Sequence, residues 1–368
     1  MQINLIADGS VGSAPAGFTA AVQAAANIYD QAFIGNYIVN IRYGWGTFDN
    51  ETSSELSSPS AFSIGGPVNY TSVSYATVKS WLIADATLSD QKAVVASLPA
   101  SDTAFPGDAN SFYVSSAQEK ALGEFAGNSS AVDGAIGFNT ADASDSFYWE
   151  TAALCEIGHA LGWMTEYYAG QPTILDLFRY ASAGQYQWTG GQPAYFSIND
   201  GTTPLATFAT SFDYTLFRNV ASNDPFNVAG DSNPAQALTS LDTEVLNVIG
   251  FGAQPYSDLE AYVALSSSKV AAGGGLAISL YDLNMGNSAA GASMTAVYLS
   301  TEPTINSDDT LLTTTTVAAL SAYPAAGYYD HQNFLVTLPG NLAPGLLHRR
   351  HCQFQRAGQR ERHPRHYL

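Results

Sequence analysis

The stretch TAALCEIGHALGW, residues 151–163, constrains this chain more than any other feature. Its apolar residues are typical of a buried helix, and Gly162 marks where that helix is expected to end. Cys155 and His159 are four residues apart, and Glu156 directly follows the cysteine. Side chains at i and i+4 lie one turn apart on the same face of a helix, so both can reach one ion. The segment therefore predicts a helix that carries a metal-binding face.

The order Cys-Glu-x-x-His differs in one letter from the HExxH pattern of zinc peptidases, because Cys155 stands where that pattern has its first histidine. Zinc binds thiolate as well as imidazole, so Cys155 and His159 are the predicted Zn²⁺ ligands. Glu156 is the predicted general base for peptide-bond hydrolysis by a metal-activated water. A thiolate donates more charge to zinc than imidazole does. We therefore expect turnover to be reduced or absent, with metal binding partly kept.

A third metal ligand is needed, and the sequence leaves two candidates open. The longer pattern HExxHxxGxxH would place a histidine where this chain has Thr165. Asp176, in TILDLFRY, is the preferred ligand because carboxylates commonly complete such sites, and Glu166 is the alternative. Each acid would otherwise be a helix cap or a solvated group.

Two other interpretations of the motif stay open. The segment is also consistent with an ordinary buried helix that carries one isolated histidine. Cys155 would also be the nucleophile of a cysteine hydrolase if His159 acted as its base, although no oxyanion motif accompanies the pair. The zinc-site hypothesis is favoured because only His159 and His331 precede the tail, and His159 falls within EIGHALG.

Local patterns divide the chain into two predicted domains and a tail. Residues 1–253 are predicted to form an α+β domain, and residues 258–345 an all-β domain of short strands separated by Gly, Ser and Asn turns. In the first domain, helices are expected at residues 18–34, 74–86, 89–98, 115–125, 146–163 and 241–252, and strands at 3–8, 37–46 and 131–139.

Composition removes several classes of function. Lys and Arg total 13 against 32 Asp and Glu, for a net charge of −19, so nucleic acid is not an expected partner. The sequence contains no run of about 18 apolar residues, so no membrane span is predicted. The two cysteines do not suggest a disulfide framework. The opening MQINLIADGS has neither the basic nor the apolar region of a secretion signal.

The tail, residues 346–368, differs sharply from the rest of the chain. It holds six arginines and four histidines but one acid, Glu361. A basic disordered tail and a histidine-rich metal-binding tract are two interpretations. We favour a shifted reading frame, because permitted codons for residues 346–363, read one base over, can encode an alternating strand followed by an acidic run. No function is assigned to the histidines of this tail.

Several stretches resemble a family of secreted bacterial zincin-like metalloproteases: ALCEIGHALGW, ILDLFRYASAG, AYFSINDGTTPLATFAT, NDPFNVA and LTSLDTEVLNVIGFG. The resemblance covers most of residues 3–252, and Glu156 and His159 match the family pattern while Cys155 departs from it. It implies a zincin-like fold, a zinc-dependent endopeptidase activity on protein or peptide substrates, and an extracellular location. Asp176 gains support because it lies inside one of the shared stretches. Because Cys155 departs from the family pattern, the alternative is a catalytically inactive binding or adhesion protein with the same fold.

Residues 258–345 resemble a CARDB-type module, an immunoglobulin-like sandwich of bacterial surface and secreted proteins. The stretches that carry this resemblance are NMGNSAAGA, VYLSTEPTINSDDTLL and LPGNLAPG. The resemblance implies surface or adhesion contacts through the sandwich. Such modules continue with a tyrosine-rich strand that the tail lacks, so the sandwich is expected to be incomplete, with an exposed sheet edge.

Overall fold

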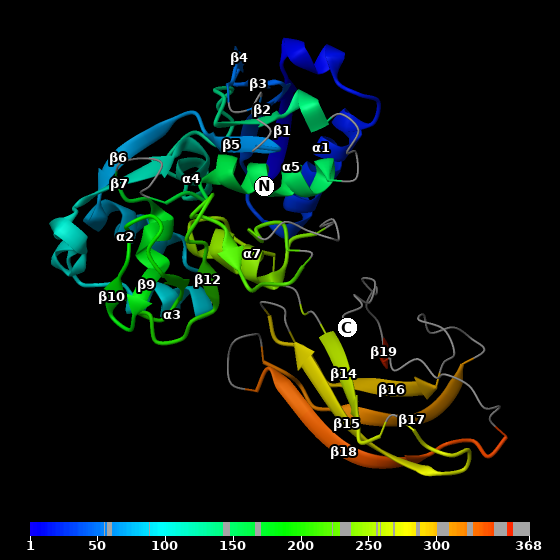
Figure 1. Ribbon diagram of the computed structural model, residues 1–368. Coiled ribbons are helices and arrows are strands. Elements are labelled where there is room, and N and C mark those ends of the chain that lie inside the picture. Colours follow the sequence, from blue (N-terminus) through cyan, green and yellow to red (C-terminus); the bar gives the residue numbers. More distant parts are fainter. Residues whose placement is uncertain are drawn as a thin grey trace. The chain divides into compact units, whose positions relative to one another are not determined.

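The computed structural model describes residues 1–341 with gaps, together with the backbone of a strand at 352–355. Its gaps are residues 55, 57–60, 88, 143–147, 166–170, 223, 229–236, 255, 256, 258, 268, 285–287, 300–308 and 322–326. The chain divides into two compact units, Met1–Gln254 and Pro255–Leu368 (Figure 1). The first unit mixes helices and strands, as predicted, whereas the described part of the second contains strands and no helix.

A four-stranded sheet with the order β1-β2-β8-β5 runs through the first unit. Its strands are β1 (Gln2–Ala7), β2 (Ile38–Trp45), β8 (Gly134–Phe138) and β5 (Ser63–Pro67). The first three are parallel, and the edge strand β5 runs antiparallel to β8. Strand β8 lies between β2 and β5 and packs against helix α5 (Trp149–Leu161), and all of its residues are buried, which is typical of a strand whose faces are covered.

Helices α1 (Phe18–Ala32) and α5 (Trp149–Leu161) pack against each other, and α5 also contacts β5 and β8. Helix α1 has an apolar stripe, on which Phe18 and Val22 are completely buried in the core. Helix α5 lies close to the sheet because β8 begins with a glycine. A Cβ built at Gly134 would lie 2.7 Å from the Cβ of Ala160, so a larger residue would push helix and strand apart.

The remaining helices agree with the predicted segments. They are α2 (Tyr75–Asp85), α3 (Ser89–Ser97), α4 (Ser116–Ala121) and α7 (Ser240–Val248). The structure adds short 3-10 helices that the sequence did not predict: η1 (Gly9–Ser13), η3 (Asp102–Ala104), η4 (Pro106–Asp108), η5 (Thr140–Asp142) and η6 (Ile174–Phe178). Serines cap two of these helices: the side chains of Ser74 and Ser115 accept bonds from the backbone of the first turns of α2 and α4.

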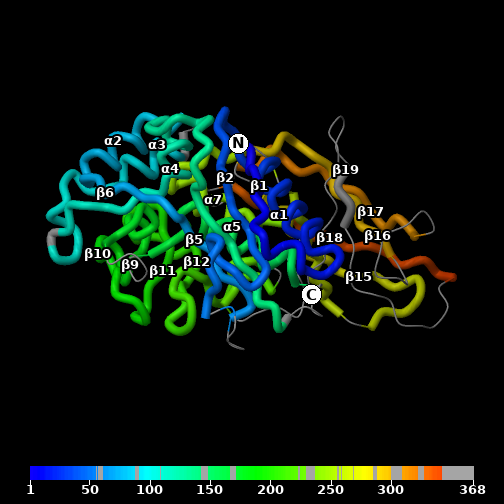
Figure 2. Tube along the Cα trace, turned by 90° about the horizontal axis from the view of Figure 1, so that it is seen from above, coloured from blue at the N-terminus to red at the C-terminus, as the bar shows by residue number. Residues whose placement is uncertain are grey.

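A second sheet of the first unit has the order β10-β9-β11-β12-β13. Its strands are β9 (Arg179–Ser182), β10 (Gln185–Tyr186), β11 (Tyr195–Phe196), β12 (Ala206–Phe208) and β13 (Phe217–Arg218). Two further pairs are β3 (Thr47–Phe48) with β4 (Glu51–Thr52), and β6 (Tyr70–Ser74) with β7 (Ser111–Ser115). In both overall views, α2, α3 and β6 lie at one end of the unit, and β1, β2 and α1 at the other (Figures 1 and 2).

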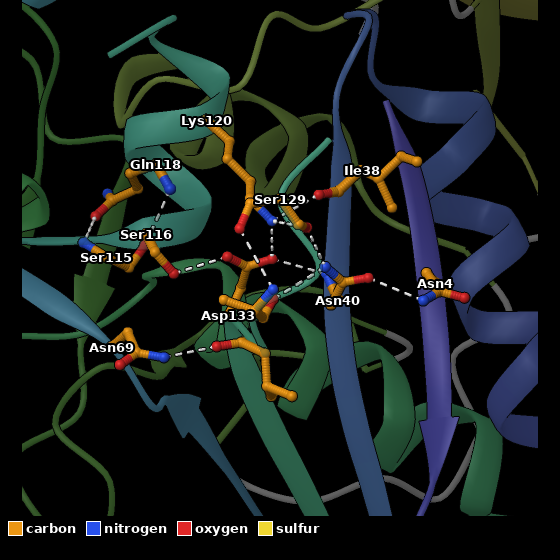
Figure 3. Close-up of polar contacts among 12 residues, drawn as sticks. Asn4, Ile38, Asn40, Asn69, Ser115, Ser116, Gln118, Lys120, Ser129 and Asp133 are labelled. Carbon is orange, nitrogen blue, oxygen red and sulfur yellow. Dashed lines mark hydrogen bonds and ion pairs between the residues drawn. The ribbon is translucent and has the colours of Figure 1, made fainter. Parts of the chain in front are cut away.

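A buried ion pair connects α4 to the residues just before β8 (Figure 3). Lys120 Nζ lies 2.6 Å from Asp133 Oδ2, and both side chains are fully buried. The ammonium also donates to two backbone carbonyls. The carboxylate accepts further bonds from the backbone N–H of Asn40 and the hydroxyl of Ser116. Hydrogen bonding on all sides offsets the cost of removing these two charges from water.

The described part of the second unit consists of two three-stranded sheets, β14-β15-β18 and β17-β16-β19. The strands are β14 (Leu259–Leu265), β15 (Gly275–Asn284), β16 (Ser293–Leu299), β17 (Thr310–Val317), β18 (Tyr329–Thr337) and β19 (Cys352–Gln355). Val297 of β16 joins Leu276 and Ile278 of β15 in one buried cluster, so the two sheets share a core. Burial alternates along β15, which is typical of a sheet with one buried face.

The tail contributes one strand to this unit. Residues Cys352–Gln355 pair antiparallel with β16. Their sequence, CQFQ, alternates apolar and polar residues, which suits an extended strand. The other residues of the predicted tail, 346–351 and 356–368, lie outside the described part of the chain.

Candidate metal centre

Helix α5 positions the three residues of the predicted motif. Glu156 and His159 are buried, and Cys155 is partly buried. Gly158 allows this side of the helix to pack tightly, because a Cβ there would lie 2.4 Å from the ring of Phe226. The predicted end of the helix is confirmed: Gly162 adopts a φ of 122° and terminates α5.

The turn after α5 fixes the tautomer of His159. The Nδ1 atom of His159 lies 2.8 Å from the backbone oxygen of Trp163. A carbonyl oxygen only accepts, so Nδ1 carries the proton and donates it. In the neutral ring, Nε2 then presents its lone pair, and the Sγ atom of Cys155 lies 3.5 Å from this nitrogen. The structure thus brings together the two side chains that the motif pairs.

Asp213 also reaches this nitrogen, and the sequence did not point to it. It lies on the connection between β12 and β13, and its Oδ2 atom is 3.4 Å from His159 Nε2. Its Oδ1 atom accepts bonds from the N–H and the hydroxyl of Thr215, at 2.8 and 2.5 Å. These two bonds direct the other carboxylate oxygen toward the imidazole. The only local signal in the sequence was D-x-T, a pattern common in turns that carries no information about distant partners.

Glu156 is held from the opposite side by β5. Its Oε1 atom accepts a 2.7 Å hydrogen bond from the hydroxyl of Ser63. Gly65 leaves room for the carboxylate, because a Cβ there would lie 2.7 Å from Oε2. Burial raises the pKa of Glu156, while His159 and the Ser63 hydroxyl act in the opposite direction. A carboxylate with a raised pKa is better suited to proton transfer near neutral pH.

The thiol of Cys155 lies in an acidic environment. Burial raises its pKa well above the usual value, and nearby carboxylates, Glu156 and Asp213 first among them, add to the effect. The thiol is therefore neutral when no cation is present. A bound metal ion would instead favour the thiolate, since a coordinated thiol loses its proton.

Asp176 takes the other role that the sequence leaves open, that of a helix cap. It is completely buried at the start of η6, where its Oδ2 atom accepts bonds from the backbone N–H and the hydroxyl of Thr173, at 2.8 and 3.2 Å. Among the residues that the structure describes, no three His, Cys, Asp or Glu side chains form a group that could hold a metal ion as they stand. The alternative candidate, Glu166, lies outside the described residues.

Comparison with known proteins finds no matching family profile and no matching curated protein. None of the helices in the described ranges combines the length and the apolar character that crossing a membrane requires.

Proposed function

We propose that the first unit is a zinc-dependent metalloendopeptidase, in which Cys155 and His159 hold the ion and Glu156 is the general base. The observation that carries this proposal is the approach of Cys155 Sγ to His159 Nε2, at 3.5 Å, on the helix that also bears the buried Glu156. A zincin-like fold for the first unit belongs to the same proposal, as does an immunoglobulin-like, CARDB-type sandwich for the second. The same proposal includes secretion of the protein, and adhesion contacts made by the second unit.

The donor atoms fit zinc in type and spacing. Zinc prefers thiolate sulfur and imidazole nitrogen, and tetrahedral bonds of about 2.3 and about 2.0 Å place two such atoms about 3.5 Å apart. The distance between Cys155 Sγ and His159 Nε2 has this value. The bond from His159 Nδ1 to a backbone carbonyl is the usual outer contact of a zinc-binding histidine, and it leaves Nε2 as the donor.

The surrounding residues suit hydrolysis of a peptide. Zinc bound here would supply Lewis-acid polarisation of water and of the scissile carbonyl. Glu156, oriented by Ser63, would accept the proton of the attacking water and pass it to the leaving amine. Strand β5 lies beside Glu156 at the edge of its sheet, with β8 as its one described neighbour. Such an edge can hydrogen-bond an extended peptide, which supports a peptide as the substrate.

A second candidate is a catalytically inactive binding protein that keeps this fold. Two observations favour it. The pKa of the Cys155 thiol is raised by burial and by nearby carboxylates, which opposes formation of a thiolate ligand. In addition, the described side chains do not form a closed group of three metal ligands.

Zinc content and peptide cleavage, measured on the full chain with the Glu156→Gln variant, separate these functions. The enzyme is expected to bind about one zinc per chain and to cleave casein until a chelator is added. Glu156→Gln is expected to keep the zinc and lose activity by at least about 100-fold, the usual contribution of a general base. Glu150→Gln, on the first turn of the same helix, is the matched control. A chain that binds zinc but cleaves no peptide would favour the inactive protein. A chain that binds no zinc and cleaves no peptide would overturn the proposal.

A further inference from the structure

We infer that Asp213 is the third protein ligand of this zinc site, an inference that rests on the proposed function. The three donors are then the sulfur of Cys155, Nε2 of His159 and Oδ2 of Asp213. They are supplied by one turn of α5 and by the loop between β12 and β13. The ligand is a divalent cation that accepts sulfur, nitrogen and oxygen donors, of which zinc is the best fit.

The spacing of Asp213 matches that of a zinc ligand better than that of a hydrogen-bond partner. Tetrahedral zinc with bonds of about 2.0–2.1 Å to nitrogen and oxygen places these two atoms about 3.4 Å apart. Asp213 Oδ2 lies 3.4 Å from His159 Nε2. A charge-assisted hydrogen bond between a histidine and a carboxylate would be shorter, about 2.7–2.9 Å.

The tautomer of His159 strengthens this argument. Because Nδ1 donates to the carbonyl of Trp163, Nε2 of the neutral ring is a lone pair. A carboxylate oxygen of Asp213 and the sulfur of Cys155 both face that lone pair. Without a cation, the neutral thiol of Cys155 can donate its proton to this nitrogen. A zinc ion would displace that proton and would use the sulfur, the nitrogen and the carboxylate oxygen as donors. With zinc, the negative charges of thiolate and carboxylate would balance the charge of the ion.

The loop that carries Asp213 is connected to the helix that carries the other two donors. The indole nitrogen of Trp163 donates a 2.9 Å bond to the backbone oxygen of Thr215, and Thr215 in turn holds Oδ1 of Asp213. Phe212, just before Asp213, has a φ of 61°, a conformation that costs free energy in an aromatic residue and often occurs at functional sites. Trp163 and Thr215 thus position both the imidazole and the carboxylate.

Closing the three donors on an ion requires a movement of a side chain, since the described residues form no closed group of three as they stand. Asp213 is the donor that can move. Its side chain is 26% exposed, compared with 5% for His159. We expect the ion to draw the Asp213 carboxylate inward while α5 keeps its conformation.

Cobalt binding to the full chain tests the inference, because Co²⁺ in a site with a thiolate ligand gives sulfur-to-metal charge-transfer and visible d–d bands. The affinity is measured by competition with a chelator, for the wild type, Asp213→Asn and Asp213→His. Outer contacts of metal ligands contribute about 10–100-fold to affinity, so loss of a direct ligand should weaken binding by at least about 100-fold. Asp213→His, which supplies another ligand, should restore most of the affinity. Asp200→Asn is the matched control, because Asp200 is an exposed carboxylate on another loop of the same unit.

The outcomes separate this inference from the proposed function. If folded Asp213→Asn binds cobalt as tightly as the wild type does, the inference would be overturned and the peptidase proposal would stand. If Asp213→Asn loses cobalt affinity as expected, while the wild type binds metal but cleaves no peptide, the inference would be supported and the peptidase proposal overturned. Absence of metal binding in the wild type would overturn both.

Discussion

Gly65, in the edge strand β5, is the position where one added methyl group should damage the site most selectively. A Cβ at Gly65 would lie 2.5 Å from the backbone oxygen of Glu156 and 2.7 Å from its Cβ and Oε2 atoms, whereas ordinary contacts of a Cβ begin at 3.4 Å. The strand and the helix would therefore have to separate by roughly 1 Å, because a packed interior has no spare volume to absorb the overlap.

A misplacement of this size has a predictable kinetic cost. A shift of about 1 Å in a catalytic group can lower the rate by about 100-fold. The three atoms nearest to the added Cβ in Gly65→Ala all belong to Glu156, so the clash falls first on the general base. We therefore expect kcat for a peptide substrate to fall by about 100-fold, with the zinc content unchanged.

The adjacent glycine of the same strand provides the control. A Cβ at Gly66 would have nothing within 4 Å, so Gly66→Ala should keep the wild-type kcat. Steady-state cleavage of a fluorogenic peptide, with zinc content and thermal unfolding measured on the same samples, would check both variants. Full activity in a folded, zinc-loaded Gly65→Ala protein would refute the reasoning, as would equal damage from Gly66→Ala.

Three further predictions follow from the same structure. Cys155→His should raise kcat, since imidazole donates less charge than thiolate and leaves the ion a stronger Lewis acid; unchanged cleavage by a zinc-loaded variant would contradict this. Lys120→Met leaves the carboxylate of Asp133 buried without its ion-pair partner, so the free energy of unfolding should fall by about 3–5 kcal/mol. Urea denaturation measures this loss, and adding Asp133→Asn should recover part of it. Burial raises the pKa of Asp224 to about 6, next to the buried Asp242. The folded state therefore holds this proton more tightly than the unfolded state, and stability should fall as the pH rises from about 4 to above 6. Thermal unfolding across that range checks the trend, and a flat profile in the wild type would contradict it.

Elements decided by local pattern could be predicted from the sequence. The apolar stripe of α1, the serine cap of α4 and the end of α5 at Gly162 all depend on residues within a few positions of one another. The pairing of Cys155 with His159 was predictable for the same reason, because helical geometry alone brings i and i+4 together.

Contacts between distant segments could not be predicted in this way. Asp213 belongs to a loop of a sheet whose strands have two to four residues, too short to show a periodicity. Asp176 was preferred because carboxylates commonly complete zinc sites, and its place in a stretch resembling zincin-like proteases added support. The sequence T-x-x-D from Thr173 to Asp176 also fits a helix cap, and the structure uses both residues in this way. The partnership of Lys120 with Asp133 likewise depends on how α4 and the sheet come together.

X-ray absorption at the zinc edge, on the full chain loaded with one equivalent of zinc, tests the central claim most directly. Coordination by Cys155, His159 and a carboxylate predicts one sulfur at about 2.3 Å and the remaining nitrogen and oxygen ligands at about 2.0–2.2 Å. In Cys155→Ala the sulfur contribution should disappear. Zinc surrounded by nitrogen and oxygen alone in the wild type, or a chain that binds no zinc, would contradict the account.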